Sequence, residues 1–252
     1  MRTDFAFCPG CGAKVVNTRL TFHGIFTDIV ERFFNLENSL YRTLKDMTVR
    51  PERVISGYIE GIRRRYMTPM NYLAMSLAVS GISMLAMRKW ALDKINFDIF
   101  NTGMTSAASR KIMDVVMEYH SFIQVLYIPV IAIAAWLALN KRKYNLPEHV
   151  VGATYTISQI TFLTFPISLV VMLTVPEYYM RYSLIFIPVM LCYILFVLLR
   201  LHPYRGGSAV LRSVLFAVLF FVGYMGISIL INLVMILAGF VEIEDFVPKP
   251  SA

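Results

Sequence analysis

Charged residues are scarce in this chain of 252 residues, of which 16% are Asp, Glu, Lys or Arg and 57% are hydrophobic. A water-soluble domain usually carries about 25% charged residues. The composition therefore excludes a single soluble domain and favours a membrane protein. The net charge of +8 is also typical of nucleic-acid binding, but the basic residues flank apolar runs. That placement favours contact with anionic lipids, so we expect membrane lipids and no nucleic acid as partners.

Common catalytic motifs are absent as well. The chain has no HExxH, GxSxG or Walker A sequence, which removes the usual signatures of zinc proteases, α/β-hydrolases and P-loop NTPases. Its four histidines, His23, His120, His149 and His202, lie in separate segments at predicted membrane edges. A membrane hydrolase could be assembled from Glu148, His149 and His202, but such a set arises easily by chance. We expect a protein that is not an enzyme.

Five apolar stretches are long enough to cross a membrane, which takes about 17–25 helical residues. None contains a charged residue in its interior, and because proton- or sodium-coupled carriers commonly need one, coupled transport is disfavoured. The predicted fold class is all-α, a polytopic membrane protein whose transmembrane domain covers residues 69–239. A surface helix around residues 112–119 is expected before the second span. The predicted spans are Pro69–Met87, Phe122–Leu139, Val150–Val175, Ser183–Leu199 and Val214–Gly239.

The distribution of lysine and arginine predicts the orientation, because cytoplasmic loops retain these residues. Most of the 24 lie in residues 1–68, 140–149 and 200–213, and few lie in 88–121, 176–182 and 240–252. We therefore expect a cytoplasmic N-terminus and an external C-terminus, with a short acidic tail at 240–252. The first 20 residues contain no apolar core of a secretory signal. The first span is then expected to direct insertion into the bacterial inner membrane.

The N-terminal residues 1–20 contain a cysteine pair, Cys8-Pro9-Gly10-Cys11. Two thiolates two residues apart can hold one side of a tetrahedral zinc, but a structural site needs four ligands. His23 offers at most a third, and the remaining cysteine, Cys192, lies inside a span. Three interpretations stay open: a zinc site shared by two copies of the chain, a site completed by a partner protein, and a degenerate ribbon that holds no metal.

Residues 21–68 predict amphipathic helices at the cytoplasmic surface. Apolar residues from Phe22 to Phe34 recur at helical spacing, which favours a helix lying in the membrane interface over one packed in a small bundle. A second short helix is expected from Ser39 to Met47. A third begins at Pro51 and ends at Gly61, since proline suits the first turn and glycine the residue after the last. Arginines follow directly, as topology anchors or as a lipid-headgroup site: Arg63, Arg64 and Arg65.

Uncharged polar residues and prolines interrupt the spans. For the polar residues we favour hydrogen bonds between helices, worth about 0.6 kcal/mol each on average. Proline removes a backbone hydrogen bond and bends a helix, and bent spans are common both in channels and in inert bundles. The predicted kinks are at Pro129, Pro166 and Pro188. The polar residues are Gln124, Thr154, Ser158, Gln159, Thr161, Thr164, Ser228 and Asn232.

The stretch TLKDMTVRPERVISGYIEGIRRRYMTPMNYL, which follows the cysteine pair and the Phe-rich helix, resembles an uncharacterised family of bacterial multi-span membrane proteins. The resemblance covers about the first third of the chain and implies location and architecture, not chemistry. A looser similarity, limited to five spans after a cytoplasmic region, links the chain to the Yip1-like membrane-trafficking proteins. The matching residues are Leu44, Asp46, Arg50, Pro51, Tyr58, Gly61, Arg63, Tyr66, Pro69, Tyr72 and Leu73.

Two functions follow as hypotheses from these features. The first is a scaffold or interaction protein, whose N-terminal module binds a protein partner or a second copy of the chain. The alternative is uncoupled, channel-like passage of a small solute or lipid through a cavity between the proline-containing spans.

Overall fold

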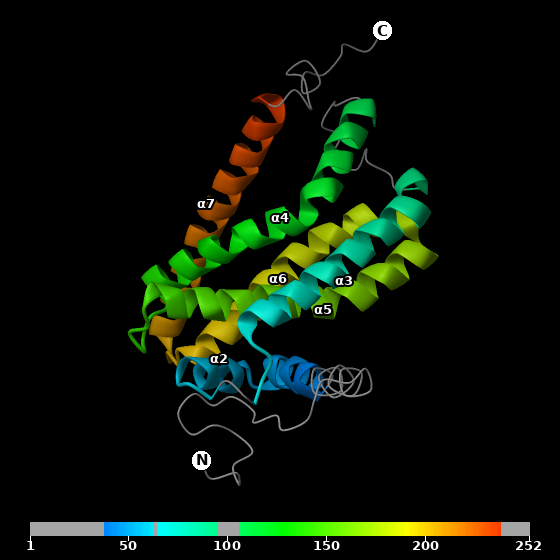
Figure 1. Cartoon of the computed structure of the whole chain (residues 1–252). Coiled ribbons are helices and arrows are strands. Elements are labelled where there is room, and N and C mark those ends of the chain that lie inside the picture. Colours follow the sequence, from blue (N-terminus) through cyan, green and yellow to red (C-terminus); the bar gives the residue numbers. More distant parts are fainter. Residues whose placement is uncertain (1–37, 63–64, 95–105, 238–252) are drawn as a thin grey trace, which may run out of the picture. The chain divides into compact units, whose positions relative to one another are not determined.

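A computed structural model describes residues 38–62, 65–94 and 106–237 (Figure 1). The chain divides into two units, Met1–Ser39 and Leu40–Ala252, and the second contains nearly all of these residues. Within the described ranges the secondary structure is helical, with no β-strand. The predicted all-α fold is confirmed.

Five helices are long and apolar enough to span a membrane, as predicted. At 1.5 Å per residue, even the 21 apolar residues Arg181–Leu201 cover about 30 Å, the thickness of the hydrocarbon core. Helices α5 and α7 begin earlier than predicted, and short 3₁₀ turns, η1 (Leu92–Lys94) and η3 (Pro176–Tyr178), follow α3 and α5. The spanning helices are α3 (Pro69–Trp90), α4 (Ser106–Ala138), α5 (Leu146–Thr174), α6 (Tyr179–Leu201) and α7 (Gly207–Leu237).

The expected surface helix before the second span is not a separate element. It forms the first part of α4, which runs without interruption from Ser106 to Ala138 and bends partway along its length (Figure 1). No residue between 112 and 122 breaks a helix, since the first proline is Pro129. The polar residues in this segment therefore do not mark the end of a helix.

Helix α2 (Pro51–Ile59) begins and ends as the sequence predicts. Pro51 occupies the first turn, where the missing N–H costs nothing. At the other end Gly61 takes φ +95°, and the N–H of Ile62 donates to the carbonyl of Gly57 at 2.8 Å. The N–H of Gly61 reaches the Tyr58 carbonyl at 3.2 Å, so the helix ends in a Schellman motif.

The apolar face of α2 contacts protein and not acyl chains. Val54 and Ile55 are fully buried in a cluster with Tyr155 of α5 and Leu201 of α6. The preceding helix, residues 38–49, adds Met47 to the same cluster. The two short helices are thus a platform packed against one end of the spanning bundle, and their amphipathic pattern reflects that packing.

Packing within the bundle is uneven. Helix α3 packs mainly on α5, and α4 packs on both α5 and α7. Only 11% of the most apolar window of α7 is buried, against 39% for α3. Most of the α7 surface is therefore free to face lipid, which fits its apolar residues on every side. At its contact with α4, Gly223 leaves room for Val130.

Candidate binding site between the spans

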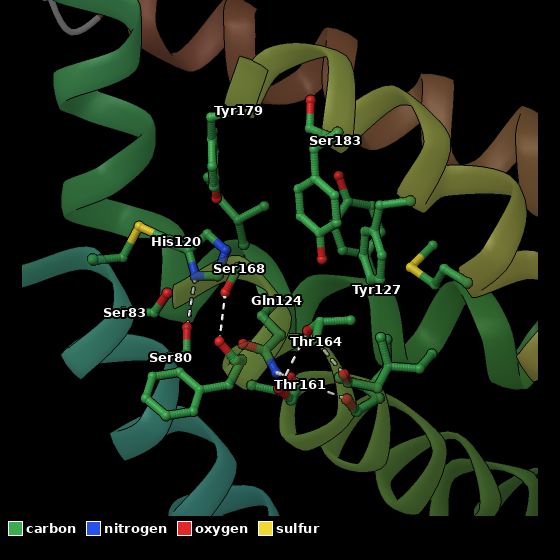
Figure 2. Close-up of a pocket in the computed structure, with 18 residues that line it drawn as sticks. Ser80, Ser83, His120, Gln124, Tyr127, Thr161, Thr164, Ser168, Tyr179 and Ser183 are labelled. Atoms are coloured by element: carbon green, nitrogen blue, oxygen red, sulfur yellow. Dashed lines mark hydrogen bonds between the residues drawn. The ribbon is translucent and has the colours of Figure 1, made fainter. Parts of the chain in front are cut away.

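A cavity of about 270 Å³ lies among α3, α4, α5 and the first half of α6 (Figure 2). It extends from the middle of the bundle toward the end remote from α2, because its wall uses the second half of α3 and the first half of α6. Ligand pockets commonly measure about 300–1,000 Å³. This cavity is at the small end of that range and suits a small molecule or a head group.

Helix α5 supplies a row of hydroxyl groups to the cavity. Thr161, Thr164 and Ser168 have the i, i+3, i+7 spacing that places side chains on one helix face. Each hydroxyl donates to a carbonyl of its own helix: Thr164 Oγ1 to Ile160 at 2.9 Å and Ser168 Oγ to Phe165 at 2.9 Å. With their protons committed to the backbone, these oxygens remain available as acceptors.

Gln124 of α4 crosses to this row. Its Nε2 donates to Thr161 Oγ1 at 2.6 Å, and Thr161 Oγ1 in turn donates to the Ile157 carbonyl at 3.2 Å. With the threonine proton directed to the Ile157 carbonyl, the threonine oxygen accepts, and the amide nitrogen of Gln124 is assigned to the side that faces Thr161. The Gln124 Oε1 atom is then buried with no hydrogen-bond partner in the described part of the chain.

A second polar pair joins α3 to α4. Ser80 Oγ and His120 Nδ1 are 2.8 Å apart (Figure 2). Ser80 is buried, and Ser83 lies one turn further along the same face of α3. Small hydroxyl residues on this face keep the wall thin and leave the space that the cavity occupies.

Aromatic residues from the start of α6 complete the wall. The rings of Tyr179 and Tyr182 lie 6.1 Å apart between centroids, and Tyr182 and Phe186 lie 6.4 Å apart. On the opposite side, Tyr127 stacks on Tyr224 of α7 at 5.4 Å. Among the described lining residues none is Asp, Glu, Lys or Arg. The surface of the cavity is mostly apolar and carries a few uncharged polar groups, which suits a neutral ligand that is largely apolar and forms a few hydrogen bonds.

The sequence prediction found this site only in part. Gln124, Thr161 and Thr164 were identified as polar residues within spans, whereas Ser80, Ser83 and Ser168 were missed. The i, i+3, i+7 spacing on α5 was the signal that could have found Ser168.

Hydrogen bonds between helices, the interpretation favoured for the polar residues, are found for three of them. Gln124 of α4 and Thr161 of α5 bond each other, and Gln159 of α5 bonds to Tyr72 of α3 and, at 2.9 Å, to Thr48 Oγ1. Four others bond a carbonyl of their own helix instead: Thr154, Ser158, Thr164 and Asn232. A short side chain can reach the preceding turn as easily as the next helix.

The other predicted site residues lie apart from the cavity or outside the described residues. Five of them lie outside the described residues: Cys8, Cys11, His23, Arg63 and Arg64. Arg65 is exposed, with its guanidinium 5.4 Å from the ring centroid of Tyr66. The three prolines lie inside helices as expected: Pro129 in α4, Pro166 in α5 and Pro188 in α6. Pro166 lies between Thr164 and Ser168, beside the cavity.

His149 and His202 meet at the end of the bundle near α2. Their rings stack with centroids 5.3 Å apart, both are buried, and the ring of Tyr144 packs edge-on at 5.3 Å from His202. Burial, the neighbouring His149 and the charge of Arg142 lower the pKa of His202 to about 3, which keeps it neutral. Glu148 accepts the N–H of Asn145 at 2.7 Å as part of a capping box. Its carboxylate caps α5, which weakens the suggested hydrolase.

The fold and the cavity define an integral membrane protein of five helical spans. Residues 37–81 match a family described as "Protein of unknown function (DUF3667)". No curated protein and no solved structure matches the chain. The matched residues support similarity to an uncharacterised family, while the cysteine pair, the motif and the Yip1-like resemblance remain predictions from the sequence.

The matched segment holds the short helices against the spans. Tyr66 Oη donates to Asp46 Oδ2 at 2.6 Å, and the N–H of Met67 donates to Thr43 Oγ1 at 3.0 Å. Burial raises the pKa of Tyr66, and the Asp46 carboxylate raises it further. Tyr72 bonds the buried Gln159, which also reaches the helix at 38–49. These polar contacts account for several residues of the sequence motif as structural contacts.

Proposed function

We propose that this protein binds a small, uncharged, hydrogen-bonding solute or lipid head group in the cavity between α3 and α6 and allows its uncoupled passage. The observation that carries the proposal is a cavity within the spans whose mostly apolar lining includes several uncharged hydrogen-bonding groups. Polar groups inside a membrane are costly and commonly mark solute pathways. The described lining contains no Asp, Glu, Lys or Arg, which supports facilitated passage or simple binding.

A cavity-filling variant tests this proposal. Ser168→Phe should fill the space, because Ser168 is buried and lines the cavity. Ile167→Phe is the matched control, since Ile167 is 54% exposed and lies outside the lining. Native mass spectrometry in mild detergent should detect a bound molecule on the wild type and on Ile167→Phe but not on Ser168→Phe. Equal spectra for all three proteins would contradict the proposal.

The scaffold function is a second candidate, supported by the cysteine pair Cys8 and Cys11, which lies outside the described residues. The two functions separate on deletion of residues 1–20. A carrier in liposomes should keep its solute flux, for example of glycerol, after this deletion. A scaffold should show no flux and should lose its protein partner or its second copy.

We further propose that the chain resides in the bacterial inner membrane with its N-terminus in the cytoplasm. The basic loops that predicted this orientation lie at one end of the bundle. Lys141 Nζ donates to the Pro203 carbonyl at 2.5 Å, and Arg212 Nη1 donates to the Ala138 carbonyl at 3.0 Å. These two contacts join both loops at the end where α2 packs, as the positive-inside rule requires. Labelling of single cysteines introduced at Glu177 and Arg205 tests the assignment, since only the first should react from outside.

A further inference from the structure

We infer that the ligand of this cavity presents an uncharged hydroxyl group, and that the hydroxyl donates its proton to Oε1 of Gln124. The ligand class is thus a neutral alcohol carried by an amphiphile, such as a monoacylglycerol. This inference rests on the proposed function and adds to it the chemistry of the bound group.

The first support is the state of the Gln124 amide. The side chain is 9% exposed and lines the cavity. Its Nε2 donates to Thr161 Oγ1, and Thr161 Oγ1 donates to the Ile157 carbonyl. Oε1 is left as a buried acceptor with no partner among the described residues. Burying an acceptor without a hydrogen-bond partner is unfavourable, so a ligand that donates to this atom binds with an advantage.

The second support is the direction of the neighbouring hydroxyls. Thr164 and Ser168 give their protons to backbone carbonyls, so toward the cavity they offer oxygen lone pairs. The α5 side of the cavity is therefore rich in acceptors, and it discriminates against a ligand that can only accept, such as an ether, an ester or a ketone. A cationic donor is disfavoured too, because the described lining offers no carboxylate to balance its charge.

The third support is the position of the cavity at the edge of the bundle. Its α6 wall includes Tyr182, Phe186 and Met190, which are only half-buried. The adjacent residues Ile185 and Ile187 are apolar and exposed. One layer of side chains thus separates the uncharged polar interior from the lipid-facing surface. A lipid whose polar head enters the cavity and whose chain stays in the bilayer fits this arrangement.

The test uses two ligands that differ only in whether their two hydroxyl groups are free or methylated. 1-Oleoylglycerol carrying a photoreactive diazirine in its chain is compared with the analogue in which both hydroxyls are methyl ethers. The protein is the full chain in nanodiscs of zwitterionic lipid. We expect crosslinking of the wild type to favour the alcohol by about fivefold, because one hydrogen bond contributes about 1 kcal/mol. The peptide labelled should come from α4, α5 or α6.

Variants then assign the effect to Gln124. Gln124→Met keeps the length of the side chain and removes the acceptor, so alcohol and ether should crosslink equally. Ile167→Phe should behave as the wild type, and Ser168→Phe should block both ligands. A wild type that crosslinks both ligands equally, with Ser168→Phe still blocking both, would overturn the hydroxyl inference while leaving the proposed function intact. Crosslinking unaffected by Ser168→Phe would overturn both, and this comparison needs no Gln124 variant to fold.

A competition arm separates a lipid from a free solute as the source of the hydroxyl. Excess glycerol should reduce crosslinking of 1-oleoylglycerol only slightly if the acyl chain contributes to binding. Complete displacement by millimolar glycerol would assign the cavity to a free polyol and overturn the amphiphile part of the inference.

Discussion

The contact between α4 and α7 depends on a glycine whose replacement has a calculable effect. A methyl group added at Gly223 would lie 2.5 Å from Cγ1 of Val130. That distance is well inside van der Waals contact, and Val130 cannot turn aside easily because its β-branched side chain has one strongly preferred rotamer in a helix. Gly223→Ala must therefore move the two helices apart or strain Val130.

Gly226 provides the matched control on the same helix. A methyl group there meets nothing within 4 Å, so Gly226→Ala changes only the helix propensity, worth about 0.5–1 kcal/mol in favour of alanine. Overpacking of this kind typically costs about 1–3 kcal/mol. We expect Gly223→Ala to be less stable than Gly226→Ala by about 1–3 kcal/mol, with the propensity effect cancelling in the comparison.

Unfolding by SDS titration in mixed micelles, followed by circular dichroism, measures this difference. A double-mutant cycle with Val130→Ala adds a sharper criterion, because shortening Val130 removes the clash. Gly223→Ala should then cost nothing in the Val130→Ala background. Equal stabilities for Gly223→Ala and Gly226→Ala, or a clash that persists without the valine methyl groups, would refute the packing of α4 on α7 described above.

Three further predictions concern other parts of the chain. Gly61→Ala should destabilise the protein by about 1 kcal/mol, because Gly61 takes φ +95°. Gly57→Ala, inside α2 with open space around it, should be neutral or stabilising. Equal SDS unfolding midpoints for the two variants would argue against the Schellman motif at the end of α2. His202 has a pKa lowered to about 3, so its contribution to stability is present above the unfolded pKa of about 6.5 and is lost as the pH falls toward 3, by up to about 1.4 kcal/mol per pH unit. His202→Gln should therefore weaken the pH dependence of the SDS unfolding midpoint between pH 7 and pH 5. An unchanged pH dependence would contradict the buried neutral imidazole. If zinc is shared between two copies, Cys8→Ser should remove the metal and the dimer together in native mass spectra, and loss of zinc with an unchanged oligomer would exclude that site.

The spans could be predicted from the sequence because the bilayer imposes a strong and local rule. Every spanning helix needs about 20 apolar residues, and α3 begins at its predicted first residue, Pro69. The two ends of helix α2 could be predicted as well, because Pro51 and Gly61 each set the backbone conformation of the helix turn in which they lie. The length of a span and the ends of a short helix depend on residues close together in the sequence, so they can be predicted from it.

The cavity could not be predicted because its residues come from four helices. His120 and Gln124 are four residues apart on one face of α4, but nothing in the sequence indicates their approach to Ser80 of α3 or Thr161 of α5. The docking of α2 was missed for a related reason, since an apolar helix face has the same pattern whether it meets lipid or protein. Only the partner residues Tyr155 and Leu201, about 100 or more positions away, distinguish the two cases.

Buried polar atoms without a partner occur at both ends of the bundle, and they differ in whether they line the cavity. Near α2, Tyr72 and Gln159 bond each other across helices. Glu52 Oε2 and the Nε2 atoms of His149 and His202 are buried near the same end with no hydrogen-bond partner among the described residues. Toward the other end, Gln124 Oε1 is in the same state, and of these four residues only Gln124 lines the cavity. Burial without a partner therefore does not by itself mark a binding site. The position of Gln124 in the cavity wall is what makes its acceptor available to a ligand.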